Sequence, residues 1–173
     1  PMGIIGEQWC GVVEGRLPES DVPIYFIDHD LYYGRESLYN DEHGQGFLDN
    51  DNRFVFLSRA ALQMCKMLEW PPDVVHANDW QTAAIPLFLN THYAHDPMLY
   101  QTAGVQTIHN MQHQGSFYEG LMDVLDVGWE HFTFEELEWL DQVNLLKGAI
   151  YHAQQVSTVS RGYAQEIQTE EYG

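Results

Sequence analysis

Positive charge is scarce in this 173-residue sequence, which carries 7 Lys and Arg against 26 Asp and Glu. The resulting formal net charge of −19 disfavours binding to nucleic acid or to an anionic membrane surface. No apolar run approaches the roughly 18 residues of a membrane span, and no basic segment precedes an apolar core as in a signal peptide. The two cysteines, Cys10 and Cys65, form no CxxC motif, which favours reduced thiols in a reducing compartment.

Several short signatures of catalysis are also missing. The sequence has no GxGxxG or GxxxxGKS/T phosphate-binding loop and no GxSxG nucleophile elbow. Nine histidines are present, but they show neither HExxH spacing nor close pairing with cysteine. The sequence therefore predicts no metal site.

The composition is that of a packed globular protein, with 45% hydrophobic and 13% aromatic residues, and the length predicts one domain. Short apolar strands are expected near residues 73–77, 105–109 and 155–159, with helical stretches between them. Successive strand–helix–strand units specify a parallel sheet. We therefore predict an α/β fold, a Rossmann-like parallel sheet with helices on both faces.

The N-terminal third is expected to begin with a hairpin of two strands, at residues 6–17 and 22–28. A long loop without periodicity is expected from residue 29 to residue 50. A helix over residues 53–69 follows, because apolar side chains recur there at helical spacing and Pro71–Pro72 stops it.

Local signals predict later helices. Asp79 opens a helix that Pro86 bends or breaks. Thr133 and Glu136 stand three residues apart, as in a capping box, which predicts a helix to about residue 140. Another helix is expected over residues 141–152, because its apolar residues lie on one face.

Polar side chains follow two of the predicted parallel strands, where each strand ends. Asp79 and Trp80 come after the first of the three strands, and His109 and Asn110 end the second. In an open parallel sheet, ligands bind just beyond the carboxyl ends of the strands. Because carboxylate, imidazole and amide groups hydrogen-bond to a polyol, the two strand ends suggest a sugar site. Asp79 is also a favoured helix-capping residue, and the two roles are compatible.

Residues 72–83 read PDVVHANDWQTA, and residues 107–115 read TIHNMQHQG. They resemble the PDVVHxHDWHT and TxHNxxxQG segments of bacterial glycogen synthases and plant starch synthases. Further stretches similar to this family are residues 22–29, 52–61, 143–150 and 158–167. Together the stretches cover nearly the whole chain, in the family's order and at its spacings.

The resemblance implies a retaining glucosyltransferase of the two-domain GT-B type. The expected partners are a nucleotide-sugar donor, ADP-glucose or UDP-glucose, and an α-1,4-glucan that receives glucose at its non-reducing end. No metal or other cofactor, no nucleic acid and no membrane is expected to take part. The expected location is the bacterial cytoplasm or the plastid stroma.

The resemblance also implies roles for single residues. His109 is the expected catalytic residue, which hydrogen-bonds the donor glucose. Asp79, Trp80 and Asn110 are expected to line the substrate side of the cleft, and Tyr39 is expected to face it.

Two positions depart from the family pattern, because Asn78 and Gln81 stand where the family usually has histidine. An amide donates and accepts hydrogen bonds but does not titrate. The amide side chains at these two positions can therefore still position a substrate by hydrogen bonding, but they cannot act as an acid or a base.

The family's KxGGL loop and its entire C-terminal domain have no counterpart in the sequence. Residues 1–173 are therefore expected to be part of an incomplete N-terminal catalytic domain, inactive by itself. A sheet without its first strand exposes an edge, and self-association through such an edge is expected.

Two other functions remain open from the sequence. The first is a catalytically silent glucan-binding or regulatory module of the same ancestry. The second is an unrelated nucleotide-binding α/β domain that acts as an interaction module, and the missing glycine-rich loop argues against it.

Overall fold

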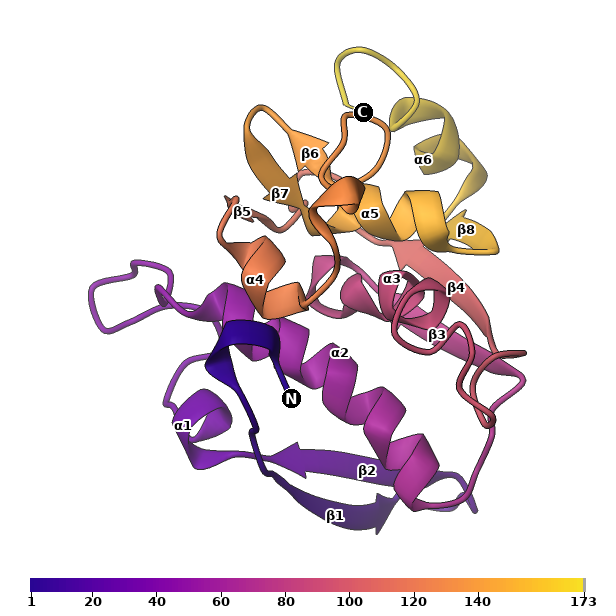
Figure 1. Cartoon of the computed structure of the whole chain (residues 1–173). Coiled ribbons are helices and arrows are strands. Elements are labelled where there is room, and N and C mark those ends of the chain that lie inside the picture. The colour runs from indigo at the N-terminus through magenta and orange to yellow at the C-terminus, as the bar shows by residue number, and fades with distance from the viewer. Residues whose placement is uncertain (173) are drawn as a thin grey trace.

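The computed structural model describes residues 1–172 and contains three small sheets (Figure 1). The N-terminal sheet is an antiparallel hairpin of β1 (Gly11–Arg16) and β2 (Pro23–Asp28), as predicted. A short 3-10 helix, η1 (Gly3–Ile5), precedes it. The hairpin lies on the side of α2 (Asn50–Met67) away from the parallel sheet (Figure 1).

The central sheet is parallel and has the strand order β3–β4–β8. Its strands are β3 (Val74–Asn78), β4 (Ala103–Ile108) and β8 (Gln155–Thr158), each within two residues of its predicted position. β3 and β8 both pair with β4 in parallel register, so all three carboxyl ends lie at one edge. The predicted parallel sheet is confirmed.

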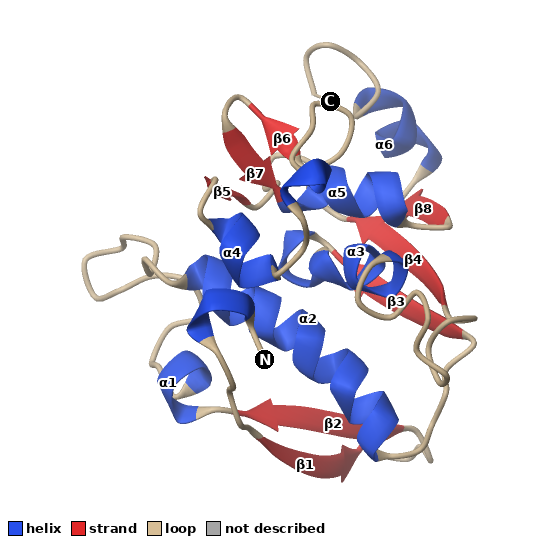
Figure 2. Cartoon of the chain, in the orientation of Figure 1, coloured by secondary structure: helices blue, strands red, loops and turns tan. Residues whose placement is uncertain are grey.

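Four helices pack around the hairpin and the parallel sheet (Figure 2). α2 lies between the hairpin and α3 (Ala84–Asn90), while α5 (Leu145–His152) and α6 (Arg161–Glu166) flank β8. α2 begins three residues before its predicted start and ends ahead of Pro71–Pro72. In the described part of the chain, no helix combines the length and the apolar character needed to cross a membrane.

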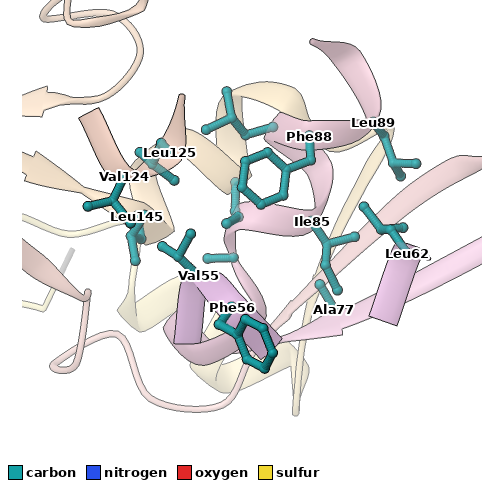
Figure 3. Close-up of a cluster of buried hydrophobic side chains, with 14 of the residues drawn as sticks. Val55, Phe56, Leu62, Ala77, Ile85, Phe88, Leu89, Val124, Leu125 and Leu145 are labelled. Atoms are coloured by element: carbon teal, nitrogen blue, oxygen red, sulfur yellow. The ribbon is translucent and has the colours of Figure 1, made fainter. Parts of the chain in front are cut away.

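The hydrophobic core forms where α2 and α3 meet the parallel sheet and the α4 region (Figure 3). Val55, Leu62 and Phe88 have no exposed surface, and Ala77 of β3 is 1% exposed. Burying a valine, leucine or phenylalanine side chain stabilises the fold by about 1.5–3 kcal/mol. This core holds β3 against α3 and thereby fixes the strand end that precedes Asp79.

Pro86 divides the predicted helix after Asp79 into two parts. Residues Trp80–Thr82 form a 3-10 turn, η2, and α3 starts at Ala84. Pro86 then falls in the first turn of α3, where a helix needs no backbone N–H donor. The predicted break is confirmed.

The helix predicted from the capping box is wrong. Glu136 N–H does bond to Thr133 O at 3.0 Å, but this is a single turn. The chain then forms β6 (Glu138–Trp139), which pairs antiparallel with β7 (Gln142–Asn144). The Glu136 side chain turns toward His131 and the buried His152 instead of the Thr133 backbone, so no capping box forms.

The resulting third sheet, β5–β7–β6, also includes β5 (Ser116–Tyr118). It was not predicted, because two- and three-residue strands carry no clear alternation of apolar and polar residues. The predicted helix over 141–152 consequently starts only at Leu145. Two short elements connect this region, α4 (Leu121–Leu125) and η3 (Trp129–His131).

The segment predicted as a long loop has internal order beyond its short helix α1 (Asp30–Tyr33). Arg35 forms a two-pronged ion pair with Asp49, at 2.8 and 2.6 Å, which holds the pKa of the Asp49 carboxyl below its usual value. Arg53 is 1% exposed and donates to Tyr32 O at 2.7 Å and Leu38 O at 2.9 Å. A buried guanidinium of α2 therefore positions the loop that carries Tyr39.

Candidate functional site at the carboxyl ends of the parallel strands

Asp79 and His109 meet at the carboxyl ends of β3 and β4. Asp79 Oδ1 accepts the His109 backbone N–H at 2.7 Å, and Asp79 Oδ2 lies 3.0 Å from His109 Nδ1. The side chains are 29% and 46% exposed, respectively. The predicted proximity of the two strand ends is confirmed, and the pair is open to solvent.

The backbone of Asp79 is strained. Its φ of 55° and ψ of −170° lie outside the regions that a residue with a Cβ usually adopts, at a cost of about 1–3 kcal/mol. The peptide is held by its N–H to Thr107 O at 2.9 Å and by Gln106 Nε2, which donates to Asp79 O at 3.1 Å. Gln106 has no exposed surface, so the restraint comes from the interior of the sheet. The strained conformation directs the Asp79 carboxylate toward His109.

Asp79 also determines which nitrogen of the His109 ring is available to a ligand. The carboxylate beside Nδ1 favours the tautomer with the proton on Nδ1, because a carboxylate only accepts. In neutral His109, Nε2 is then a hydrogen-bond acceptor for a hydroxyl group. Such a nitrogen at an open strand end is suited to bind a polyol.

Trp80 is half-buried and packs between two aromatic rings. Its ring centroid is 4.8 Å from that of Phe54 and 5.5 Å from that of Phe117. Gly115 covers it: a Cβ on Gly115, whose φ is +66°, would lie 2.8 Å from the indole. Trp80 therefore packs against the loop after β4 at Gly115. This close approach of the indole to the backbone needs glycine at position 115.

Tyr39 reaches the site region from the loop before α2. Its hydroxyl accepts a hydrogen bond from Gln81 Nε2 at 2.8 Å, and its ring lies 5.8 Å from Phe54, the ring that also contacts Trp80. Tyr39 is 37% exposed. The departure from the family pattern at position 81 therefore supplies the contact that ties the Tyr39 loop to the strand end.

Asn110 is exposed and begins the loop after β4. Its Oδ1 accepts the Gln112 N–H at 2.9 Å, which closes a local turn. The next residue, Met111, donates its N–H to the Tyr163 hydroxyl of α6 at 2.8 Å. Tyr163 thus anchors the turn at its middle residue.

Sequence reasoning missed two residues that organise the site. Gln106 holds the Asp79 peptide, and Tyr163 anchors the loop at Met111. A positioning role was kept for Gln81, but its partner Tyr39 was not predicted. The alternation along β4 could have marked Gln106, because a polar residue there faces the buried side of a strand. No sequence signal pairs Gln81 with a residue 42 positions away.

The fold and the site define a class: a Rossmann-like α/β domain whose polar side chains gather at the carboxyl ends of parallel strands, where such domains bind ligands. The family model described as starch synthase catalytic domain matches residues 1–173. The chain belongs to this family.

Relatives and a solved structure agree with this assignment. The chain is 62% identical to glycogen synthase 1 of Geobacter metallireducens and 61% identical to that of Geobacter sulfurreducens, over all 173 residues. The catalytic domain of starch synthase IV from Arabidopsis thaliana, solved bound to ADP and acarbose, superposes with a TM-score of 0.82 at 29% identity. That match covers 95% of this chain. The predicted family and the predicted α/β fold of the GT-B type are confirmed.

The chain spans about a third of these proteins: 34% of each Geobacter sequence and 33% of the starch synthase IV chain.

Proposed function

We propose that this chain contributes one wall of the active-site cleft of a glycogen or starch synthase, as part of its N-terminal domain. The complete enzyme would transfer glucose from ADP-glucose or UDP-glucose to the non-reducing end of an α-1,4-glucan with retention of configuration. Two relatives and one solved structure support this proposal: the Geobacter relatives are glycogen synthases, and the starch synthase IV structure holds ADP and acarbose.

The observation that carries the proposal is the Asp79–His109 pair. Its carboxylate occupies Nδ1 and leaves His109 Nε2 free to accept a hydrogen bond from a hydroxyl of the donor glucose. A group held at 2.7 and 3.0 Å by a restrained partner is preorganised, so no reorientation is needed when substrate binds.

The other predicted residues have supporting roles in this proposal. Asn110 presents its amide beside His109, and Trp80 supports the loop that carries both of them. Tyr39, fixed by Gln81, borders the same cleft. A wall this exposed excludes water only when a second domain closes over it. We therefore expect no transfer by residues 1–173 alone.

A chimeric enzyme tests the proposal directly. In Geobacter metallireducens glycogen synthase 1, residues 1–173 of this chain replace the segment that they match. The match covers the whole chain at 62% identity. Glucose transfer to glycogen is measured from ADP-glucose and from UDP-glucose. We expect transfer by the chimera and a loss of about 100- to 1,000-fold in kcat on His109→Ala, as for removal of one preorganised polar group.

His113→Ala is the matched control, because His113 is exposed in the same loop and takes no part in the hydrogen bonds between Asp79 and His109. It should retain the chimera's activity. An active chimera in which His109→Ala behaves like His113→Ala would disprove the role of His109. A folded chimera that binds maltooligosaccharides without transfer from either donor would instead favour a silent glucan-binding module.

A further inference from the structure

Three potential metal ligands converge on the far end of α5 from the strand-end site. His131 ends η3, Glu136 lies in the turn before β6, and His152 ends α5. His131 Nδ1, a Glu136 carboxylate oxygen and His152 Nε2 all lie within 4.8 Å of one another. Among residues 1–172 this is the one group of three or more such side chains.

Both imidazoles face the same carboxylate oxygen. Glu136 Oε1 is 2.6 Å from His131 Nδ1 and 2.5 Å from His152 Nε2. The two rings are tilted by 55°, with centroids 6.1 Å apart, so they flank the carboxylate and do not stack. Both separations are shorter than the 2.7–3.2 Å of ordinary N–H···O hydrogen bonds.

The cluster is enclosed on one side and accessible on the other. The side chains of Glu136 and His152 are 9% and 7% exposed, whereas that of His131 is 25% exposed. An ion and one water ligand could therefore enter past His131, while the other two ligands stay out of solvent. Three protein ligands and one open position are the arrangement of many zinc sites.

The surrounding structure holds the ligands in place. Asn90 of α3 donates to His152 O at 2.8 Å and fixes the last turn of α5. The Glu136 backbone is fixed by its N–H to Thr133 O at 3.0 Å, and that of His131 by its N–H to Gly128 O at 3.1 Å. Three separately anchored backbones therefore present one ligand each.

The ligand set selects the kind of metal. Two imidazole nitrogens and one carboxylate suit zinc and its transition-metal neighbours, whereas Mg²⁺ and Ca²⁺ prefer oxygen ligands throughout. With metal–ligand distances of about 2.0–2.2 Å and tetrahedral angles, the ligand atoms would stand about 3.3 Å apart. The Glu136 oxygen stands closer than this, at 2.6 and 2.5 Å from the two nitrogens, so metal binding requires the carboxylate to withdraw from both rings.

We propose that His131, Glu136 and His152 form a zinc-binding site that links the end of α5 to the segment between η3 and β6. The proposal is independent of the proposed transferase function, because it uses none of the residues at the strand ends. The sequence alone predicts no metal site, since the ligands are spaced 5 and 16 residues apart, unlike the short spacings of common zinc motifs.

Zinc binding to the full chain tests the proposal. After dialysis against EDTA, the chain is titrated with Zn²⁺ by calorimetry and with Co²⁺ by visible absorption, which reports tetrahedral coordination. We expect one Zn²⁺ per chain, a higher melting temperature with zinc, and at least about 100-fold weaker binding in His131→Gln and Glu136→Gln. Loss of a direct ligand should exceed the 10–100-fold cost of losing a ligand's outer partner.

His43→Gln is the matched control, because His43 lies 3.6 Å from Glu42 in an exposed pair that lacks a third ligand. It should bind zinc like the original chain. His131→Gln changes the most exposed of the three ligands, so circular dichroism should show an intact fold. Absence of saturable zinc binding, or binding that His131→Gln leaves unchanged, would overturn the proposal.

Discussion

Two histidine–carboxylate groups in this molecule use the same chemistry in opposite surroundings. The Asp79–His109 pair lies at an open sheet edge, with side chains 29% and 46% exposed. The Glu136–His152 pair lies inside, with side chains 9% and 7% exposed. The first pair leaves one ring nitrogen free at the surface, while the second shares its carboxylate with His131.

The difference teaches that burial decides what such a pair does. An exposed pair contributes little to stability, commonly 0–1 kcal/mol, so its fixed geometry is available for binding. A buried pair leaves an unsatisfied polar group if one partner is lost, so it matters for folding. The strained Asp79 backbone fits this distinction, because backbone strain of about 1–3 kcal/mol is characteristic of functional sites.

The largest expected effect is on catalysis, from Asp79→Asn in the chimeric enzyme. The amide oxygen can still accept the backbone N–H of His109. The amide NH₂ group then lies opposite ring atom Nδ1, which reverses the favoured tautomer of the ring. We expect kcat to fall by roughly 100- to 1,000-fold, no further than in His109→Ala because Asp79 acts through His109, with the KM for glycogen unchanged. Steady-state kinetics at several pH values measure this. Wild-type kcat in a variant with a native circular dichroism spectrum would contradict the tautomer argument.

The next effect is on stability, from Glu136→Ala. The change leaves two ring N–H groups without their acceptor in a buried region, which costs about 2–4 kcal/mol. Urea unfolding in the presence of EDTA measures the loss without any contribution from metal. Glu42→Ala removes an exposed partner and should change the free energy of unfolding by less than about 0.5 kcal/mol. Equal losses in the two variants would remove the distinction between the buried and the exposed pair.

The smallest effect concerns pH and a third enclosed histidine, His92. Burial lowers the pKa of His92, and the neighbouring Arg59 guanidinium lowers it further. The unfolded chain, with an ordinary histidine pKa near 6.5, therefore takes up this proton before the folded chain does. Stability should fall as the pH drops below about 6.5, and less steeply in His92→Gln. Urea midpoints measured across this range test it, and parallel curves for the two proteins would refute it.

The parallel sheet and its polar ends could be predicted because the signals are local. The strands at Val74–Asn78 and Ala103–Ile108 are short apolar runs between breakers, and the carboxyl ends of parallel strands meet at one edge. These two signals by themselves predict that Asp79 and His109 are neighbours. Pro86 likewise carries its own constraint on the backbone, and the predicted break followed from it.

The errors fall where distant contacts overrule local signals. Thr133 and Glu136 have the spacing of a capping box, but the Glu136 side chain bonds to His131 and to His152, 16 residues away. A long-range partner inside the core outweighs a surface cap worth about 1 kcal/mol. The helix expected there is consequently a turn followed by the β6–β7 pair.

The sequence by itself determined the family, the α/β class and the two strand ends that carry polar residues, because periodicity, breakers and motif spacing are written along the chain. Only the tertiary structure decided which side chains meet across it. It set Gln106 under the Asp79 peptide, Gln81 against Tyr39, and two histidines around Glu136. The physical reason is that hydrogen bonds and burial depend on distance in space, and residues 5 to 42 positions apart acquire that proximity only through folding.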